Sequence, residues 1–232
     1  MSKFKNILGI VLARENSKGI KDKNLLKINS KTLIEIAIET ALKSKKINKL
    51  IFSSDSEKLI KIAKKKIEVK FKRPKYLAKD NSSSYDVAKH AIKWLIKNEN
   101  WNTDIVVILS PTTPFRKAKH IDQTINKLIK SNSNTAMIIT EPSYPPYWML
   151  KKNKNNYKFI FPGGKRIYRR QDCPKAYQAS GMVYAFTSKH LFKIKSVLPE
   201  KKTACVIVDR KEAVNIDNII DYKLAKALSK KI

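Results

Sequence analysis

The chain has 232 residues, of which 42% are hydrophobic, and this is enough to bury one sizeable core. We therefore expect a single domain over residues 1–232. The formal net charge of +31 is typical of proteins that bind nucleic acid or anionic membranes. Because the lysines are scattered through every segment, a compositional bias explains this charge as easily, and we expect neither partner. A small polyanion would still be attracted.

The cysteine content and the hydropathy of the sequence indicate the cellular compartment of the protein. Two cysteines, Cys173 and Cys205, give no paired metal spacing and no disulfide framework. No apolar stretch is long enough to cross a bilayer, and the short run near the N-terminus does not resemble a signal peptide. These features predict a cytoplasmic protein.

Apolar runs and amphipathic stretches alternate at short intervals along the chain. The apolar runs predict strands over residues 7–13, 49–54, 67–71, 104–109, 135–140, 181–187 and 204–208. Helical spacing of apolar side chains predicts helices over residues 32–42, 56–66, 85–97, 118–130 and 218–230. This alternation predicts an α/β fold with a mostly parallel sheet flanked by helices.

The loop after the first predicted strand has the composition of a phosphate-binding loop. Arg14, Lys18 and Lys23 supply positive charge, Gly19 allows a tight backbone turn, and Ser17 can donate a hydrogen bond without adding negative charge. The loop lacks both a Gly-x-Gly pair and a correctly spaced Gly-Lys-Ser/Thr. Rossmann dinucleotide binding and Walker-type ATP hydrolysis are therefore disfavoured.

A second loop, residues 110–116, follows the most continuous apolar run. Two prolines, Pro111 and Pro114, restrict its backbone at the carboxyl end of a predicted central strand. Open α/β sheets bind their ligands at this edge, so we expect the loop to border a site.

The regular alternation ends between residues 141 and 178. Prolines and a Gly-Gly pair punctuate a stretch rich in aromatic and basic residues, which predicts an extended, hairpin-like arm. Exposed aromatic side chains on such an arm need a covering surface, and a second copy of the chain is the simplest one. We therefore expect a homodimer.

Several motifs in order resemble one enzyme family. Leu-Ala-Arg-x-Asn-Ser-Lys-Gly-x-x-x-Lys-Asn, over residues 12–24, resembles the nucleotide-binding signature of the acylneuraminate cytidylyltransferases, or CMP-sialic acid synthetases. Further matches are Ser54-Asp55, Arg73-Pro74, residues 77–84, the loop to Arg116, Arg169 to Asp172 with Pro174, Gly181 to Tyr184, and Ile216-Asp217. The resemblance implies a nucleotide-diphospho-sugar transferase-like sheet with a dimerisation arm. It also implies a reaction in which CTP and a 2-keto sugar acid give a CMP-sugar and pyrophosphate.

The resemblance also implies roles for individual residues. Arg14, Lys18, Lys23 and Asp217 would form the catalytic set. The residues implied to bind the triphosphate are Ala13, Arg14, Ser17, Lys18, Lys23 and Asn24, and those implied to contact the cytosine are Arg73, Asn81, Ser82 and Ser83. A closed pocket discriminates bases because an unpaired buried polar group costs about 1–3 kcal/mol.

Magnesium is the cofactor that the family implies, with Asp217 as a ligand, because carboxylate oxygen suits a hard cation that also bridges phosphates. The family commonly has Asp-x-Asp at this place, whereas this chain has Asn215-Ile216-Asp217. An amide oxygen of Asn215 can coordinate Mg²⁺ or position a metal-bound water, but it carries no charge. The number of ions bound stays open at this point.

The predicted sugar-binding residues are Ser110, Arg170, Gln178, Ser180 and Tyr184. Arg170 would pair with the acidic group of the sugar. Many relatives have glutamine at position 110 and Arg-x-Asn-Gly at positions 178–181. The acceptor therefore stays open among N-acylneuraminate, pseudaminic acid, legionaminic acid, another nonulosonic acid and Kdo. Two alternatives of other classes are a basic nucleic-acid-binding protein and an inactive relative.

Overall fold

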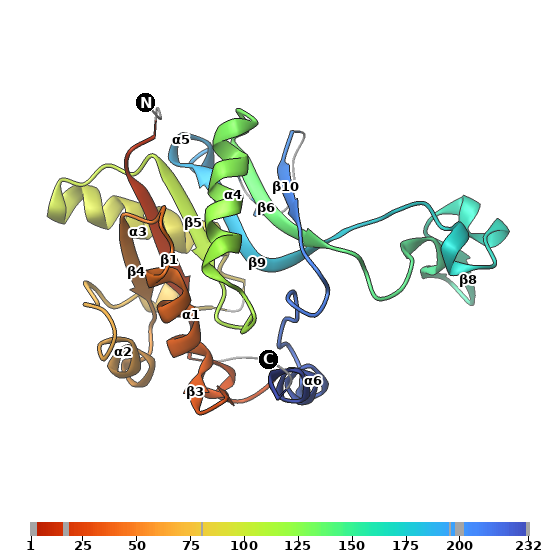
Figure 1. Cartoon of the computed structure of the whole chain (residues 1–232), viewed down its shortest axis with the longest axis horizontal. Coiled ribbons are helices and arrows are strands. Elements are labelled where there is room, and N and C mark those ends of the chain that lie inside the picture. The colour runs from red at the N-terminus through yellow and green to blue at the C-terminus, as the bar shows by residue number, and fades with distance from the viewer. Residues whose placement is uncertain (1–3, 16–18, 80, 195, 198–201, 231–232) are drawn as a thin grey trace.

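The computed structural model describes residues 4–15, 19–79, 81–194, 196–197 and 202–230. Its centre is a six-stranded sheet with the order β10-β6-β9-β5-β1-β4 (Figure 1). The strands are β1 (Ile7–Leu12), β4 (Lys49–Ser53), β5 (Ile105–Leu109), β6 (Thr135–Thr140), β9 (Gln178–Thr187) and β10 (Ala204–Ile207). Only β9 runs antiparallel to its neighbours, so the predicted mostly parallel sheet is confirmed.

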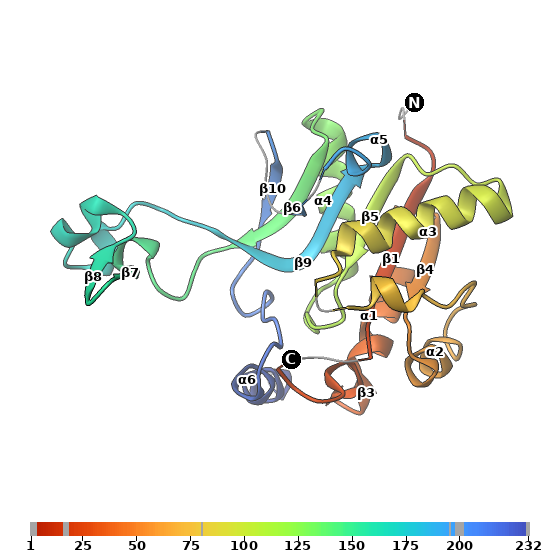
Figure 2. The same cartoon turned by 180° about the vertical axis from the view of Figure 1, so that it is seen from behind.

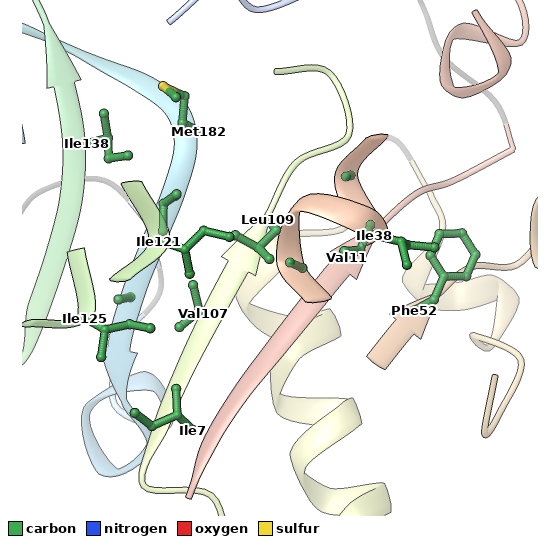
Figure 3. Packing of buried hydrophobic residues seen from close by; sticks show 14 of the residues in the cluster. Ile7, Val11, Ile38, Phe52, Val107, Leu109, Ile121, Ile125, Ile138 and Met182 are labelled. Atoms are coloured by element: carbon green, nitrogen blue, oxygen red, sulfur yellow. The ribbon is translucent and has the colours of Figure 1, made fainter. Parts of the chain in front are cut away.

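Helices cover both faces of the sheet, as the amphipathic stretches predict. The helices are α1 (Leu33–Leu42), α2 (Glu57–Ala63), α3 (Ser84–Glu99), α4 (Ala118–Lys130), α5 (Ser188–Leu191) and α6 (Ile219–Ser229). Side chains of β1 alternate between the two faces: Ile7 and Val11 pack with α1, α2 and α4, whereas Leu8 and Ile10 pack with α3. Figure 3 shows the first of these clusters, with Ile38 of α1 and Ile121 of α4 over the sheet.

A third, smaller cluster of buried hydrophobic residues packs the C-terminal helix near the edge of the sheet where the ligand site is expected. The short strands β2 (Lys27–Ile28) and β3 (Lys31–Thr32) form a hairpin beside α6, and the hydroxyl of Tyr222 donates to the carbonyl of Lys27 at 3.0 Å. Ile28 and Leu33 pack there against Ile216, which is fully buried. Burial of Ile216 fixes the positions of its neighbours Asn215 and Asp217.

Residues between β6 and β9 leave the sheet and form a separate lobe, visible at one end of the molecule in Figures 1 and 2. The lobe holds the hairpin of β7 (Leu150–Asn153) and β8 (Asn156–Phe159), flanked by short 3-10 helices η3 (Pro146–Trp148), η4 (Pro162–Arg166) and η5 (Arg170–Asp172). The Trp148 indole donates to the carbonyl of Ile167 at 2.8 Å. Tyr144 and Tyr168 are 74% and 86% exposed, so the lobe leaves aromatic surface uncovered within one chain.

One predicted strand is wrong. Residues 67–71 follow α2 as irregular backbone, and β4 is the edge of the sheet. Ile67 and Val69 pack against the cluster under α1, while Phe71 packs against the cluster under α3. Residues with an alternating apolar pattern can therefore be buried by side-chain packing alone, without a hydrogen-bonded neighbouring strand. The remaining 3-10 turns are η1 (Lys23–Leu25) and η2 (Lys75–Leu77), and no helix among the described residues has the length and hydropathy of a membrane span.

Candidate active site

Three adjoining pockets open at the edge of the sheet where β1, β5 and β6 end. The first has a volume of about 400 Å³ and is lined by residues that include Arg14, Arg73, Ser82, Ser110 and Tyr184. The second has a volume of about 380 Å³ and is lined by residues that include Arg14, Gly19, Lys23, Asn24 and Thr112. The third has a volume of about 810 Å³ and is lined by residues that include Gln178, Ser180, Tyr184, Arg210 and Asn215. Asp217 lines all three pockets, so they meet at its carboxylate.

The first loop places two of its predicted cations on the wall between the first and second pockets. Arg14 and Lys23 line both pockets. Asn24 is buried and its amide donates to the carbonyl of Arg14 at 3.0 Å, which holds the two ends of the loop together. Ala13 is buried in the core at the end of β1. Ser17 and Lys18, also predicted to bind the nucleotide, lie outside the described residues.

Gly19 brings the first loop into direct contact with the segment around Asp217. A Cβ atom at position 19 would lie 2.0 Å from the backbone oxygen of Asp217, which is closer than non-bonded carbon and oxygen atoms approach. Glycine at this position therefore allows the loop and the Asp217 backbone to touch. Two segments from opposite ends of the chain form one wall of the second pocket.

Hydrogen bonds connect the side chains around Asp217. Lys23 Nζ lies 2.9 Å from Asp217 Oδ1, and Asn215 Nδ2 lies 2.6 Å from Asp217 Oδ2. The hydroxyl of Thr112 donates to Asn215 Oδ1 at 2.5 Å and lies 2.7 Å from the hydroxyl of Ser110. The Asp217 side chain is 64% exposed, so its oxygens are accessible from the pockets. A carboxylate in this position fits a Mg²⁺ ion that also binds phosphate oxygens.

Metal-binding capacity around Asp217 is otherwise low. Within the described ranges, no group of three or more histidine, cysteine or acidic side chains is arranged to hold a metal ion. A cation bound at Asp217 would therefore need ligands from a substrate and from water to complete its coordination.

Arg73 has a role that its position in the sequence does not predict. Its side chain is buried, with Nε donating to Ser53 Oγ at 3.1 Å and Nη2 donating to the carbonyls of Ala13, at 3.1 Å, and Ser53. Burial lowers the pKa of this guanidinium to about 10. Arg73 therefore joins the ends of β1 and β4 under the first pocket. Its contact with a cytosine stays a prediction, since these donors are already used.

The serines after Arg73 have two different roles: one caps α3, and another lines the first pocket. Ser83 caps α3, because its hydroxyl accepts from the backbone of Asp86 at 3.2 Å. Ser82 lines the first pocket and donates to the carbonyl of Tyr76 at 3.1 Å, while Asn81 is exposed. Of the four residues predicted to contact the cytosine, Arg73 and Ser82 line the first pocket, whereas Asn81 and Ser83 do not.

The predicted sugar-binding residues do not all come together within one chain. Ser110 lines the first two pockets, Gln178 the third, and Tyr184 the first and third. Burial raises the pKa of the Tyr184 phenol. Ser180 lines the third pocket, but its hydroxyl is committed to the Ile138 carbonyl at 3.0 Å.

Arg170 lies elsewhere. It lines a hollow of about 120 Å³ within the arm, beside Glu141 and Cys173, and the three central pockets do not include it. The expectation that Arg170 and Tyr184 share a pocket is therefore wrong for a single chain. The reason is that the arm leads away from the sheet before it reaches position 170 (Figure 2).

Sequence analysis missed the function of Arg116. This side chain is 3% exposed, and its Nη1 donates to the carbonyls of Ser110 at 2.7 Å and Met182 at 2.9 Å and to Thr113 Oγ1 at 2.9 Å. Burial lowers the pKa of the Arg116 guanidinium to about 10. It therefore fixes the loop of residues 110–116 against β9. Its place at the end of the loop that contains Pro111 and Pro114 is the sequence signal that could have indicated it.

We expect the substitution Arg116→Met to lower the free energy of unfolding by about 2–4 kcal/mol, because two buried carbonyls lose their donor. Urea denaturation followed by circular dichroism measures this. Arg210→Met, which removes an exposed arginine, is the matched control and should change stability by less than about 0.5 kcal/mol. Equal stability of the two variants would contradict the bracing role of Arg116.

Comparisons with known proteins identify the family. The sequence model of the family described as cytidylyltransferase matches residues 8–229. The chain is 32% identical over 224 residues to the pseudaminic acid cytidylyltransferase of Campylobacter jejuni, with 96% of each protein covered. It is 28% identical to the N-acylneuraminate cytidylyltransferase of Escherichia coli, over 97% of this chain and 52% of that protein.

A solved structure agrees with these relatives at the level of the fold. A CMP:2-keto-3-deoxy-manno-octonic acid synthetase complexed with CTP superposes with a TM-score of 0.70 over 98% of this chain and 99% of that one, at 14% identity. The predicted fold class is thereby confirmed. Together with the motifs and the geometry above, these findings show that the chain belongs to the cytidylyltransferase family, among the relatives of the acylneuraminate cytidylyltransferases.

Proposed function

We propose that this cytidylyltransferase joins CTP to a nine-carbon 2-keto sugar acid, a nonulosonic acid such as N-acylneuraminate, and releases pyrophosphate. One observation carries the proposal: a pocket bordered by Arg14 and Lys23 and a larger pocket bordered by Tyr184 both open on Asp217. Two substrates bound in these pockets would meet at one carboxylate. This is the arrangement that a transfer between a nucleotide and a sugar requires.

In the proposed mechanism, the anomeric hydroxyl of the sugar attacks the α-phosphorus of CTP in line and gives its proton to water, while the bond from that phosphorus to the bridging oxygen of pyrophosphate breaks. Arg14 and Lys23 stabilise the negative charge on the phosphates, with the help of backbone donors of the first loop. Asp217 would hold Mg²⁺, which neutralises phosphate charge when bound. The contribution of the protein is positioning and electrostatics.

The third pocket is the proposed site of the sugar acid. Arg210 and Lys211 line it, and Arg210 Nη2 donates to Ser143 Oγ at 2.9 Å, which holds the guanidinium at the pocket wall. A guanidinium so placed can pair with a sugar carboxylate. The relative from Campylobacter jejuni makes pseudaminic acid the first alternative to N-acylneuraminate, followed by legionaminic acid and Kdo. The product would supply surface polysaccharide from the cytoplasm.

The arm gives Arg170 a second way to reach a sugar. Within one chain Arg170 lies outside the central pockets, and the arm carries exposed Tyr144 and Tyr168. We infer that the chain forms a homodimer in which each arm lies over the third pocket of the partner. Arg170 would then act on the acidic group of a substrate bound by the other copy.

The function is tested by measuring pyrophosphate release with Mg²⁺ and CTP, ATP, GTP or UTP, against N-acylneuraminate, pseudaminic, legionaminic acid and Kdo. We expect release with CTP and one of the nonulosonic acids. Release with Kdo alone would correct the acceptor. Absence of both release and CTP binding would contradict the enzyme proposal, and salt-dependent binding to any nucleic acid duplex would then favour the alternative suggested by the charge.

The phosphate-binding role predicts large losses in two variants. Arg14→Ala and Lys23→Ala should each lower kcat/KM for CTP by about 10²–10³-fold, because each removes a donor that faces developing charge. Lys27→Ala, which removes an exposed lysine on β2, is the matched control and should leave kcat/KM unchanged. Turnover close to that of the wild type in both Arg14→Ala and Lys23→Ala would exclude this role.

The shared site predicts complementation between two inactive variants. Arg170→Ala and Lys23→Ala, mixed after reversible unfolding, should form heterodimers with one intact site, so the mixture should recover about a quarter of wild-type activity. Each variant refolded alone is the control. If no activity returns although the heterodimer forms, Arg170 acts within its own chain or does not contact the substrate.

A further inference from the structure

Five polar side chains form a continuous chain of contacts across the bottom of the site. From one end to the other they are Ser110, Thr112, Asn215, Asp217 and Lys23, with successive donor–acceptor distances of 2.7, 2.5, 2.6 and 2.9 Å. They come from three segments: the loop after β5, the segment before α6, and η1. Asn215 is the central member of this chain.

The neighbours of Asn215 determine how its amide is oriented. An ionised carboxylate accepts hydrogen bonds and cannot donate them, so the amide atom 2.6 Å from Asp217 Oδ2 has to be the nitrogen. The amide oxygen then faces the hydroxyl of Thr112, which can donate to it. The reversed amide would place two acceptors together at Asp217. Both ends of the side chain therefore agree on one orientation.

This orientation makes Asn215 a poor ligand for a metal ion bound at Asp217. Its nitrogen, which cannot coordinate Mg²⁺, is the atom that faces Asp217, while its oxygen faces Thr112. The backbone agrees, because Ile216 is buried and its N–H donates to the carbonyl of Thr112 at 2.8 Å, which holds position 215 against the loop. The expected metal-binding role of Asn215 is not supported by these contacts.

The same contacts hold Asp217 in place without a metal ion. Its Oδ1 accepts from Lys23 and its Oδ2 from Asn215, so each carboxylate oxygen has one donor and keeps a free lone pair. A cation that binds at Asp217 replaces no structural ligand. The neighbouring carboxylate, Asp221, already accepts through Oδ2 from the backbone N–H groups of Asp217 and Asn218, each at 2.9 Å.

We propose that Asn215 is a positioning residue that holds Asp217 in place of a second metal-binding carboxylate, so that the divalent cation binds only together with the triphosphate. The inference deepens the proposed function and rests on it. The protein in its unliganded form has no appreciable affinity for free Mg²⁺. One cation per chain enters with CTP, because the phosphate oxygens supply the ligands that the protein lacks.

The test compares the wild type with Asn215→Asp, using Mn²⁺ as the probe in electron paramagnetic resonance and Mg²⁺ in thermal unfolding. In the wild type we expect the free Mn²⁺ signal to fall only when CTP is present, to one bound ion per chain, and Tm to be unaffected by Mg²⁺ alone. In Asn215→Asp two carboxylates come within hydrogen-bonding distance and need a cation between them. We expect Mn²⁺ binding without CTP, at least about tenfold tighter than in the wild type, and a rise in Tm with Mg²⁺ of roughly 2–4 °C or more.

Asn218→Asp is the matched control. Asn218 lies at the exposed N-cap of α6, where aspartate caps equally well, so this variant adds the same charge nearby without a contact to Asp217. It should behave as the wild type. Thr112→Val tests the other end, because it removes the donor to Asn215. We expect it to raise the Kd of Mn²⁺ in the presence of CTP and to lower Tm only slightly.

Two results would overturn the inference. One is Mn²⁺ binding to the wild type without CTP as tight as in Asn215→Asp, and the other is an Asn215→Asp variant that gains no cation dependence. These measurements need no sugar and no turnover. If the wild type neither binds Mn²⁺ with CTP nor releases pyrophosphate with any acid, the proposed function fails, while the comparison of Tm without CTP still decides the role of Asn215.

Discussion

The geometry of the site depends on hydrogen-bond donors for the backbone carbonyls where the central strands end. Carbonyls where a strand ends beside a pocket have few backbone partners, although that of Ser53 also accepts from the N–H of Ala13 at 3.2 Å. Leaving such a carbonyl buried without a donor costs about 1–3 kcal/mol. Two buried guanidinium groups supply the donors: Arg73 for Ala13 and Ser53, and Arg116 for Ser110 and Met182. Each group joins two segments, so the loops that carry the pocket walls are fixed to the sheet.

The use of guanidinium groups as these donors also determines the electrostatic potential under the pockets. Neither guanidinium makes an ion pair with a carboxylate in the described part of the chain, so both add positive potential under pockets already bordered by Arg14 and Lys23. Burial disfavours these charges, as the lowered pKa of about 10 for each shows. A bound triphosphate would offset part of this cost. The local arrangement of arginines is therefore more informative than the overall charge of +31.

Sequence reasoning predicts those parts of the fold that depend on local periodicity. The strands β1, β4 and β5, the helices α3 and α4, and the loops at 12–24 and 110–116 follow from runs of apolar residues and from prolines. The direction of β9 does not, because alternation is the same in parallel and antiparallel strands. Residues 67–71 show the same limit: the pattern records burial but not the presence of a neighbouring strand.

The residues of the candidate site also fall into some that the sequence could predict and others that it could not. The family resemblance drew attention to Arg14, Lys23 and Asp217, which the structure brings together. It could not show that Arg73 and Ser180, although they line pockets, use polar atoms to bind the backbone, because such residues and those that contact a ligand are polar residues in similar motifs. The partner of a buried polar group is often distant in sequence, as Thr112 is from Asn215. Such partners become visible only when the fold is known.

The two proposed substrate sites differ in how much of the chain they need. The pocket bordered by Arg14, Lys23 and Asn24 takes most of its wall from one short loop, so a single motif can preserve it. The third pocket combines β9, the loop after β10, and the start of α6, and in the proposed dimer it also receives an arm from the partner. A substitution in any of these segments changes the shape of that pocket without touching the phosphates. In the proposed function, this separation would let a common nucleotide chemistry accompany different sugar acids, and Gln178 and Tyr184, which line the third pocket, are the places to look for the basis of acceptor choice.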